Sequence, residues 1–178
     1  MAIYTTSLST PIGEMIAGAT DNGICLLDFK YRKLFPAIQR RISAGLNDVF
    51  IEGEHPLLDQ LRLELDEYFT GTRRKFDVPI HPVGSDFQQK IWVALMQISY
   101  GSVATYLQQA RVYGDEKAIR AVATANGMNG LAIMIPCHRV IGTNGSLTGY
   151  GGGLTAKRWL LNHERSNAGG DVQAWLFQ

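Results

Sequence analysis

Residues 131–135, an uninterrupted apolar run that stops at Pro136, constrain the fold more than any other stretch of the chain. The run is short and is bounded by Gly130 and Pro136, which favours a buried extended segment over a helix of ordinary length. Proline also disfavours helical geometry at the residue before it. Cys137 and His138 follow directly, so the sequence predicts a thiol beside an imidazole at the end of a buried segment.

Cys137 has two interpretations at this point. A cysteine is a good nucleophile as a thiolate, and cationic or imidazole neighbours such as His138 and Arg139 can lower its pKa from about 8.5. A buried cysteine can equally behave as a small apolar side chain. The next fourteen residues, 140–153, contain six glycines, which suits a loop of tight turns open to close approach rather than a core element. This context favours a site.

The first part of the chain predicts an antiparallel sheet followed by a helix. Residues 3–8, 14–19 and 24–29 are rich in Ile, Tyr, Thr and Leu and read as strands, with an Asn-Gly hairpin signal before the third. The pattern of residues 32–41 fits either a short helix or an exposed loop. After Pro56, apolar side chains recur three and four residues apart, which predicts a helix with one face in the core.

A stretch rich in proline and basic residues, 72–84, reads as a linker, although residues 76–78 could form another strand. We place a domain boundary near residue 83, which gives an N-terminal domain 1–83 and a C-terminal domain 84–178.

The second part of the chain predicts mainly helices. Ser85 and Gln88 have the spacing of a capping box at a helix start. Two short helices, 105–112 and 115–126, have the pattern of a helix-turn-helix pair. Thr155 is the predicted cap of a final helix that carries Glu164.

Amino-acid composition indicates a globular protein but does not by itself indicate a function. Hydrophobic residues make up 46% and charged residues 19% of the 178 residues, as in globular proteins. Residues 1–84 hold nine basic and eleven acidic side chains, whereas residues 85–178 hold eight and five, so the net charge changes from -2 to +3. This asymmetry favours the second part as the phosphate-binding face.

No apolar run approaches the roughly 20 residues of a membrane span, and the N-terminus lacks a secretory pattern. We therefore expect no membrane association and an intracellular location. Two cysteines, Cys25 and Cys137, are too few for a disulfide framework, and their neighbours lack zinc-ligand spacing. We expect Cys25 to be structural.

The C-terminal motifs resemble a known family. The motifs are Pro136-Cys137-His138-Arg139-Val140, Gly149-Tyr150, Gly152-Gly153-Leu154 and His163-Glu164. Together they resemble the O6-methylguanine-DNA methyltransferase family over roughly residues 87–164. The resemblance implies an α+β fold, in which a ribonuclease H-like α/β domain with a three-stranded antiparallel sheet precedes a mostly helical winged helix-turn-helix domain.

The resemblance also implies roles for individual residues. Cys137 would accept the alkyl group irreversibly in a single turnover, and Arg120 would fill the gap left by a flipped nucleotide. Arg139 is expected to pair with the first domain. Several relatives carry serine where Gly151 stands. The implied assignments are catalytic for Cys137, His138, Glu164 and Asn129; DNA binding and base flipping for Tyr106 and Arg120; and substrate pocket for Tyr150, Gly151 and Lys157.

The implied partner is double-stranded DNA that contains O6-alkylguanine, with O4-alkylthymine as an open second lesion. We expect a monomer that needs no cofactor or metal and works in the cytoplasm, or in the nucleus of a eukaryote. Two alternatives remain at this stage. A non-reactive lesion sensor of related type carries tryptophan at the position of Cys137, and a transcription regulator would use the helix pair alone.

Overall fold

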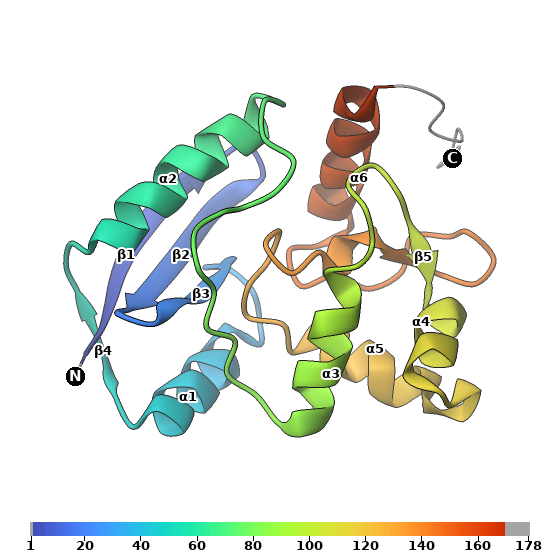
Figure 1. Cartoon of the computed structure of the whole chain (residues 1–178), viewed down its shortest axis with the longest axis horizontal. Helices are drawn as coiled ribbons and strands as arrows, with labels where there is room; N and C mark the ends of the chain where they lie inside the picture. Colours follow the sequence, from blue (N-terminus) through green and yellow to red (C-terminus); the bar gives the residue numbers. More distant parts are fainter. Residues whose placement is uncertain (1, 170–178) are drawn as a thin grey trace.

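A four-stranded mixed sheet forms the first part of the molecule (Figure 1), which is described here from a computed structural model over residues 2–169. Its strands are β1 (Ala2–Thr10), β2 (Gly13–Thr20), β3 (Gly23–Phe29) and β4 (Val49–Glu52). They lie in the order β3-β2-β1-β4, with β1, β2 and β3 antiparallel and β4 parallel to β1. The three predicted strands are present. The prediction of a three-stranded sheet is wrong because β4, a short and largely exposed edge strand, has no alternating apolar pattern.

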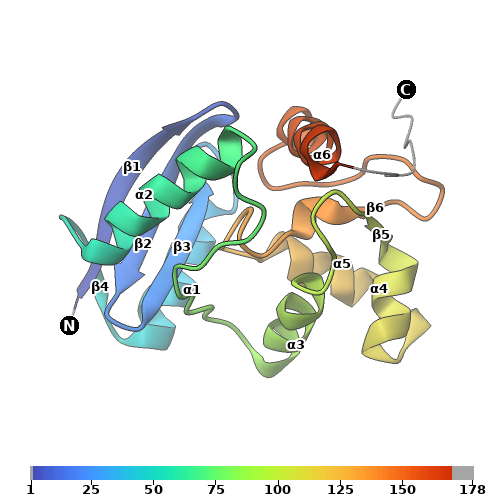
Figure 2. The ribbon, with the colours of Figure 1, turned by 45° about the horizontal axis from the view of Figure 1, so that its top comes forward.

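Two helices cover opposite faces of this sheet (Figure 2). Residues 35–46 form α1 (Phe35–Leu46), in a region where the sequence fitted either a helix or a loop. The second helix, α2 (Pro56–Phe69), starts at the predicted proline. Separate apolar clusters mark the two faces. Cys25 and Leu26 of β3 pack with Ile38 of α1, while Leu27 belongs to the larger cluster that contains Leu58 of α2. Cys25 is buried there, as expected of a structural cysteine.

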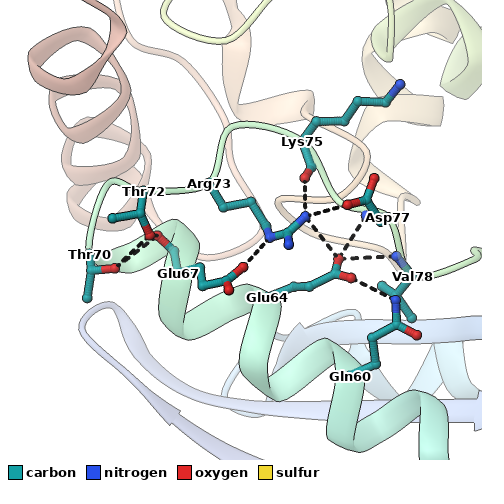
Figure 3. Close-up of polar contacts among 9 residues, drawn as sticks. All are labelled: Gln60, Glu64, Glu67, Thr70, Thr72, Arg73, Lys75, Asp77 and Val78. Atoms are coloured by element: carbon teal, nitrogen blue, oxygen red, sulfur yellow. Dashed lines mark hydrogen bonds and ion pairs between the residues drawn. The ribbon is translucent and has the colours of Figure 1, made fainter.

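The segment after α2 is fastened to that helix by a polar cluster rather than by the strand considered for residues 76–78 (Figure 3). The buried Glu64 carboxylate accepts the backbone N–H groups of Asp77 (2.8 Å) and Val78 (3.1 Å). Arg73 bridges the carboxylates of Glu67 (2.6 Å) and Asp77 (2.8 Å). Side-chain acceptors thus replace the partners that a strand would have found in a sheet.

The outer edge of β3 is covered by the end of the linker and by the segment that precedes Cys137. Ile24 exchanges backbone hydrogen bonds with Pro79 and His81, each at 2.8 Å. Leu27 exchanges bonds of the same length with Gly130 and Ala132. The segment that leads to Cys137 is therefore docked on the N-terminal sheet, and it covers part of the edge that β3 would otherwise present.

The remaining elements are mostly helical and include the predicted helix pair. They are α3 (Asp86–Leu95), β5 (Ala104–Thr105), α4 (Tyr106–Tyr113), η1 (Glu116–Ala118), α5 (Ile119–Gly127), η2 (Cys137–Arg139), β6 (Val140–Ile141) and α6 (Leu154–Ala168). The capping box of Ser85 and Gln88 is present. Gly114, in left-handed geometry, ends α4 and turns the chain toward α5. The predicted cap of the last helix is wrong, since α6 begins after Gly153 and Thr155 lies in its first turn.

No helix within residues 2–169 is long and apolar enough to cross a membrane. Residues 170–178 of the predicted C-terminal domain lie outside the described part of the chain.

Candidate active site

The segment before Cys137 is buried, as predicted, but it is not extended. Residues 131–135 are 1–8% exposed. Only Leu131 pairs with the sheet, and the chain then folds back so that the Ile135 N–H donates to the Leu131 carbonyl (2.9 Å). Ile133 has a φ of 71°, a rare geometry for a branched side chain. The expectation of a strand failed because Asn129 supplies local partners: it accepts from the Leu131 N–H and donates to the Ile135 carbonyl, both at 2.9 Å.

Asn129 also holds the cysteine. Its Nδ2 donates to the Sγ of Cys137 at 3.3 Å, and the partly exposed thiol lines a cavity. Burial raises the pKa of the Cys137 thiol, while the Asn129 hydrogen bond and the positive charges of Arg32 and Lys157 oppose this rise. The resting thiol is therefore mostly protonated near neutral pH, and its activation requires a base.

His138 and Glu164 form a fully buried pair behind the cysteine. The Nε2 of His138 lies 2.7 Å from the Oε1 of Glu164, and both side chains are at most 1% exposed. Burial alone would raise the pKa of Glu164, but His138 and hydrogen bonds from Arg139 hold it well below its usual range. Burial lowers the pKa of His138. The pair is therefore a neutral imidazole against an ionised carboxylate.

This charge state assigns the imidazole tautomer. An ionised carboxylate only accepts hydrogen bonds, so the Nε2 of His138 carries the proton that faces Glu164. The Nδ1 then presents a lone pair, and this atom is buried without a protein partner in the described residues. His138 can thus accept a proton at Nδ1, which is the property that a general base for Cys137 needs.

Two further side chains donate hydrogen bonds to Glu164. Arg139 donates from Nε (2.8 Å) and Nη2 (2.9 Å), so the prediction that it pairs with the first domain is wrong. The hydroxyl of Tyr68, on α2 of the first part, donates to Glu164 at 2.8 Å. Sequence reasoning counted Tyr68 only as an apolar position of its helix. Its hydroxyl was the available signal, because a buried tyrosine usually needs a polar partner.

The cavity that Cys137 faces has a volume of about 680 Å³ and lies between the two parts of the chain. It is large enough for a nucleobase, since small-ligand pockets span about 300–1,000 Å³. Residues from β3 and the segment after it form one side, and α4, α5 and the glycine-rich loop form the rest. The lining residues include Asp28, Arg32, Tyr106, Arg120, Asn129, Cys137, Tyr150 and Gly151.

The predicted pocket residues occupy two layers. Tyr106 and Tyr150 are in the cavity wall, and the Tyr106 hydroxyl makes a long contact of 3.5 Å with the Thr148 carbonyl. Lys157 lies behind the wall and is fully buried; its Nζ donates to the carbonyls of Val140 (2.5 Å) and Thr148 (2.8 Å). Burial lowers the pKa of Lys157 to about 8. Lys157 therefore fastens the loop rather than facing a ligand.

Arg120 is exposed in the first turn of α5, at the wall of the same cavity. Its side chain makes no hydrogen bond or ion pair with the described residues. A free guanidinium beside a cavity of nucleobase size is suited to contact phosphates or to enter a base stack.

Comparison with known proteins identifies the family. The family model of the 6-O-methylguanine DNA methyltransferase ribonuclease-like domain matches residues 3–82, and that of the DNA binding domain matches residues 86–166. The methylated-DNA–protein-cysteine methyltransferase of Methanosarcina mazei is 47% identical over 93% of this chain and 99% of its own. The chain belongs to the 6-O-methylguanine DNA methyltransferase family.

Other members of the family agree over nearly the whole length. The constitutive methylated-DNA–protein-cysteine methyltransferase of Bacillus subtilis is 40% identical, covering 91% of this chain and 95% of its own. A crystal structure of the Mycobacterium tuberculosis homologue OGT in complex with DNA superposes with a TM-score of 0.78 at 35% identity, covering 92% and 94% of the two chains.

Membership in the methyltransferase family confirms the predicted α+β fold class and the predicted activity, alkyl transfer from DNA to a protein cysteine. It does not favour the non-reactive sensor or the regulator. Within the site, the structure brings Asn129 to Cys137 and Glu164 to His138. Sequence reasoning missed Tyr68 and Arg32, which come from the first part of the chain.

Proposed function

We propose that this methyltransferase repairs O6-alkylguanine in duplex DNA by moving the alkyl group to the Sγ of Cys137, once per molecule. The observation that carries the proposal is the pairing of His138 with Glu164 behind a thiol that lines a cavity of nucleobase size. DNA as the partner is supported by the DNA complex of the M. tuberculosis homologue.

The lesion must leave the base stack before it can react, because its O6 lies inside the duplex. Arg120 on α5 would occupy the gap left by the flipped nucleotide, and Tyr106 would crowd the neighbouring phosphate and assist rotation. Both residues border the cavity that contains Cys137. Flipping costs a few kcal/mol, and a side chain inserted into the stack offsets part of this cost.

The transfer then needs a proton acceptor and a leaving group. His138 takes the thiol proton at Nδ1 through a water, and Glu164 holds the imidazole and stabilises its positive charge. The thiolate sulfur forms a bond to the alkyl carbon while the bond from that carbon to O6 breaks, and the bonding electrons pass to the guanine ring. The departing guanine ring takes up one proton from solvent, and Tyr106 would donate a hydrogen bond to the ring. His138 then releases the former thiol proton to solvent. The products are guanine and an S-alkyl cysteine.

Nothing in this scheme regenerates the thiol. A thioether has a poor leaving group at neutral pH, and Cys25 is buried in the apolar cluster under α1 and does not line the cavity of Cys137. We therefore propose a stoichiometric reaction. We also propose a division at residue 83 into N-terminal and C-terminal domains, a monomeric state, and a cytoplasmic location, or a nuclear one if the source is eukaryotic.

Duplex DNA with a labelled O6-methylguanine tests the proposal. With lesion in excess, repaired guanine should plateau at about one mole per mole of active protein, and mass spectrometry should find the methyl group on the peptide of Cys137. Cys137→Ser should bind DNA and transfer nothing, whereas the matched control Cys25→Ala should reach the same plateau as the wild type. Product that rises well past one equivalent would contradict a stoichiometric acceptor. Binding without any transfer by the wild type would favour a lesion sensor.

A further inference from the structure

An arginine of the sheet domain reaches the active-site cavity. Arg32 follows β3, is 8% exposed and lines the cavity together with Cys137. Its guanidinium lies directly against the glycine-rich loop, and a Cβ at position 151 would be only 2.5 Å from the Arg32 Cζ. The absence of a side chain at Gly151 is therefore what leaves room for this cation.

The guanidinium is fixed by a buried carboxylate and by the end of α5. Arg32 Nη1 donates to both carboxylate oxygens of Asp28 (3.2 and 3.0 Å) and to the Asn129 carbonyl (3.0 Å). Its Nη2 donates to the carbonyl of Gly127. Asp28 itself is fully buried.

These contacts satisfy groups that a helix end leaves open. The last carbonyls of α5 lack partners within the helix and carry its partial negative charge, so they favour cations. Arg32 donates to the carbonyl of Gly127, the last residue of α5, and to that of Asn129 in the turn that follows. Arg41 of α1 donates to the carbonyl of Met128 in the same turn (2.8 Å). Two arginines of the first part thus hold the turn that carries Asn129, whose side chain contacts the Cys137 sulfur.

Arg32 differs from Arg41 in its effect on the thiol. The positive charge of Arg32 favours the thiolate of Cys137, while the negative charge of Asp28 opposes it. Arg41 is not part of the cavity wall. The other titratable groups around the thiol are Lys157 from α6, Tyr106 from α4, Tyr150 from the loop and the adjacent His138.

We propose that Arg32 is a positioning residue for the transfer step, which orients Asn129 against Cys137 and stabilises the thiolate by its charge, with Asp28 limiting that stabilisation. The inference rests on the proposed role of Cys137 as the alkyl acceptor. It makes the sheet domain a contributor to the chemistry of the site, through one buried ion pair.

The test measures the rate of Cys137 alkylation by iodoacetamide against pH, in the full-length protein with Cys25→Ala to avoid a second thiol. Arg32→Met should move the midpoint of the profile to higher pH, with a rate lowered at least about threefold below the midpoint, since one pKa unit is tenfold. Asp28→Asn should move the midpoint to lower pH. Arg32→Lys should restore most of the Arg32→Met shift. The matched control is Arg40→Met, at an exposed arginine of α1 that is not part of the cavity wall, which should leave the midpoint in place.

Opposite shifts for the two partners of one ion pair separate an electrostatic role from a merely structural one, because loss of structure would change both variants in the same direction. Equal midpoints for wild type and Arg32→Met, or shifts of the same sign for both partners, would overturn the proposal. Circular dichroism checks that each variant is folded. The proposed function fails separately, if lesion DNA leaves no methyl group on Cys137 of the wild type.

Discussion

Glu164→Gln should be one of the most destabilising single substitutions in the chain, although it barely changes side-chain shape. Every group around this carboxylate is a donor: His138 and Arg139, the Tyr68 hydroxyl at 2.8 Å, and the Gly101 N–H at 3.4 Å. A glutamine would point an amide donor at one of them. The change would also leave the Arg139 cation, 8% exposed, without its partner.

Removing one partner of a buried ion pair costs about 3–5 kcal/mol. For a chain of this size, 1 kcal/mol lowers the melting temperature by about 2–4 °C, so we expect a decrease of about 6–20 °C. Thermal and urea unfolding at pH 7 measure it. The matched control is Glu67→Gln, which removes a partly exposed carboxylate that pairs with Arg73 at 2.6 Å (Figure 3) and should change stability far less.

The pH dependence provides a second check. The pKa of Glu164 is held below its usual range in the folded state, whereas in the unfolded chain it is about 4.3. A carboxyl group with a depressed pKa stabilises the fold fully above the unfolded value, and this stabilisation is lost as the pH falls toward the folded value. The difference between wild type and Glu164→Gln should therefore shrink below about pH 4. A difference under about 1 kcal/mol at pH 7, or one that stays constant down to pH 3, would refute the reasoning.

Three further substitutions probe other parts of the site. Arg120→Ala should slow repair of duplex DNA much more than reaction with free O6-benzylguanine, which needs no flipping; equal losses in the two assays would show that Arg120 does not assist extrusion. Tyr68→Phe removes one charge-assisted hydrogen bond to Glu164, which should lower the free energy of unfolding by about 1.5–3 kcal/mol and the melting temperature by about 3–12 °C. An unchanged melting curve would count against that bond. Lys157→Met should free the loop at 142–153, seen as faster proteolysis there and slower transfer, and an unaltered digestion pattern would contradict the fastening role.

Local patterns were sufficient for the elements whose signals are contained in a few neighbouring residues. The Asn-Gly hairpin before β3, the capping box at Ser85 and the apolar spacing after Pro56 each act over four residues or fewer, and each is present as predicted. The motif around Cys137 likewise identified the family, because its residues are contiguous in the chain. The short strand β4 was missed because its pairing partner, β1, lies far away in the sequence. The bent segment before Cys137 was predicted to be extended because the sequence does not show that the side chain of Asn129 supplies its hydrogen bonds.

The tertiary structure decided which distant groups complete the site. Arg139 was expected to pair with the first domain, yet it binds Glu164, 25 residues further along the chain. Tyr68 and Arg32 reach the site from the first part of the chain. In the sequence, Tyr68 was a core position of its helix, and Arg32 belonged to a segment that fitted either a helix or a loop. Hydrogen bonds and ion pairs act over a few ångströms in space, and no periodicity along the chain encodes that proximity. Only the packing of α2 and β3 against the Cys137 segment creates it.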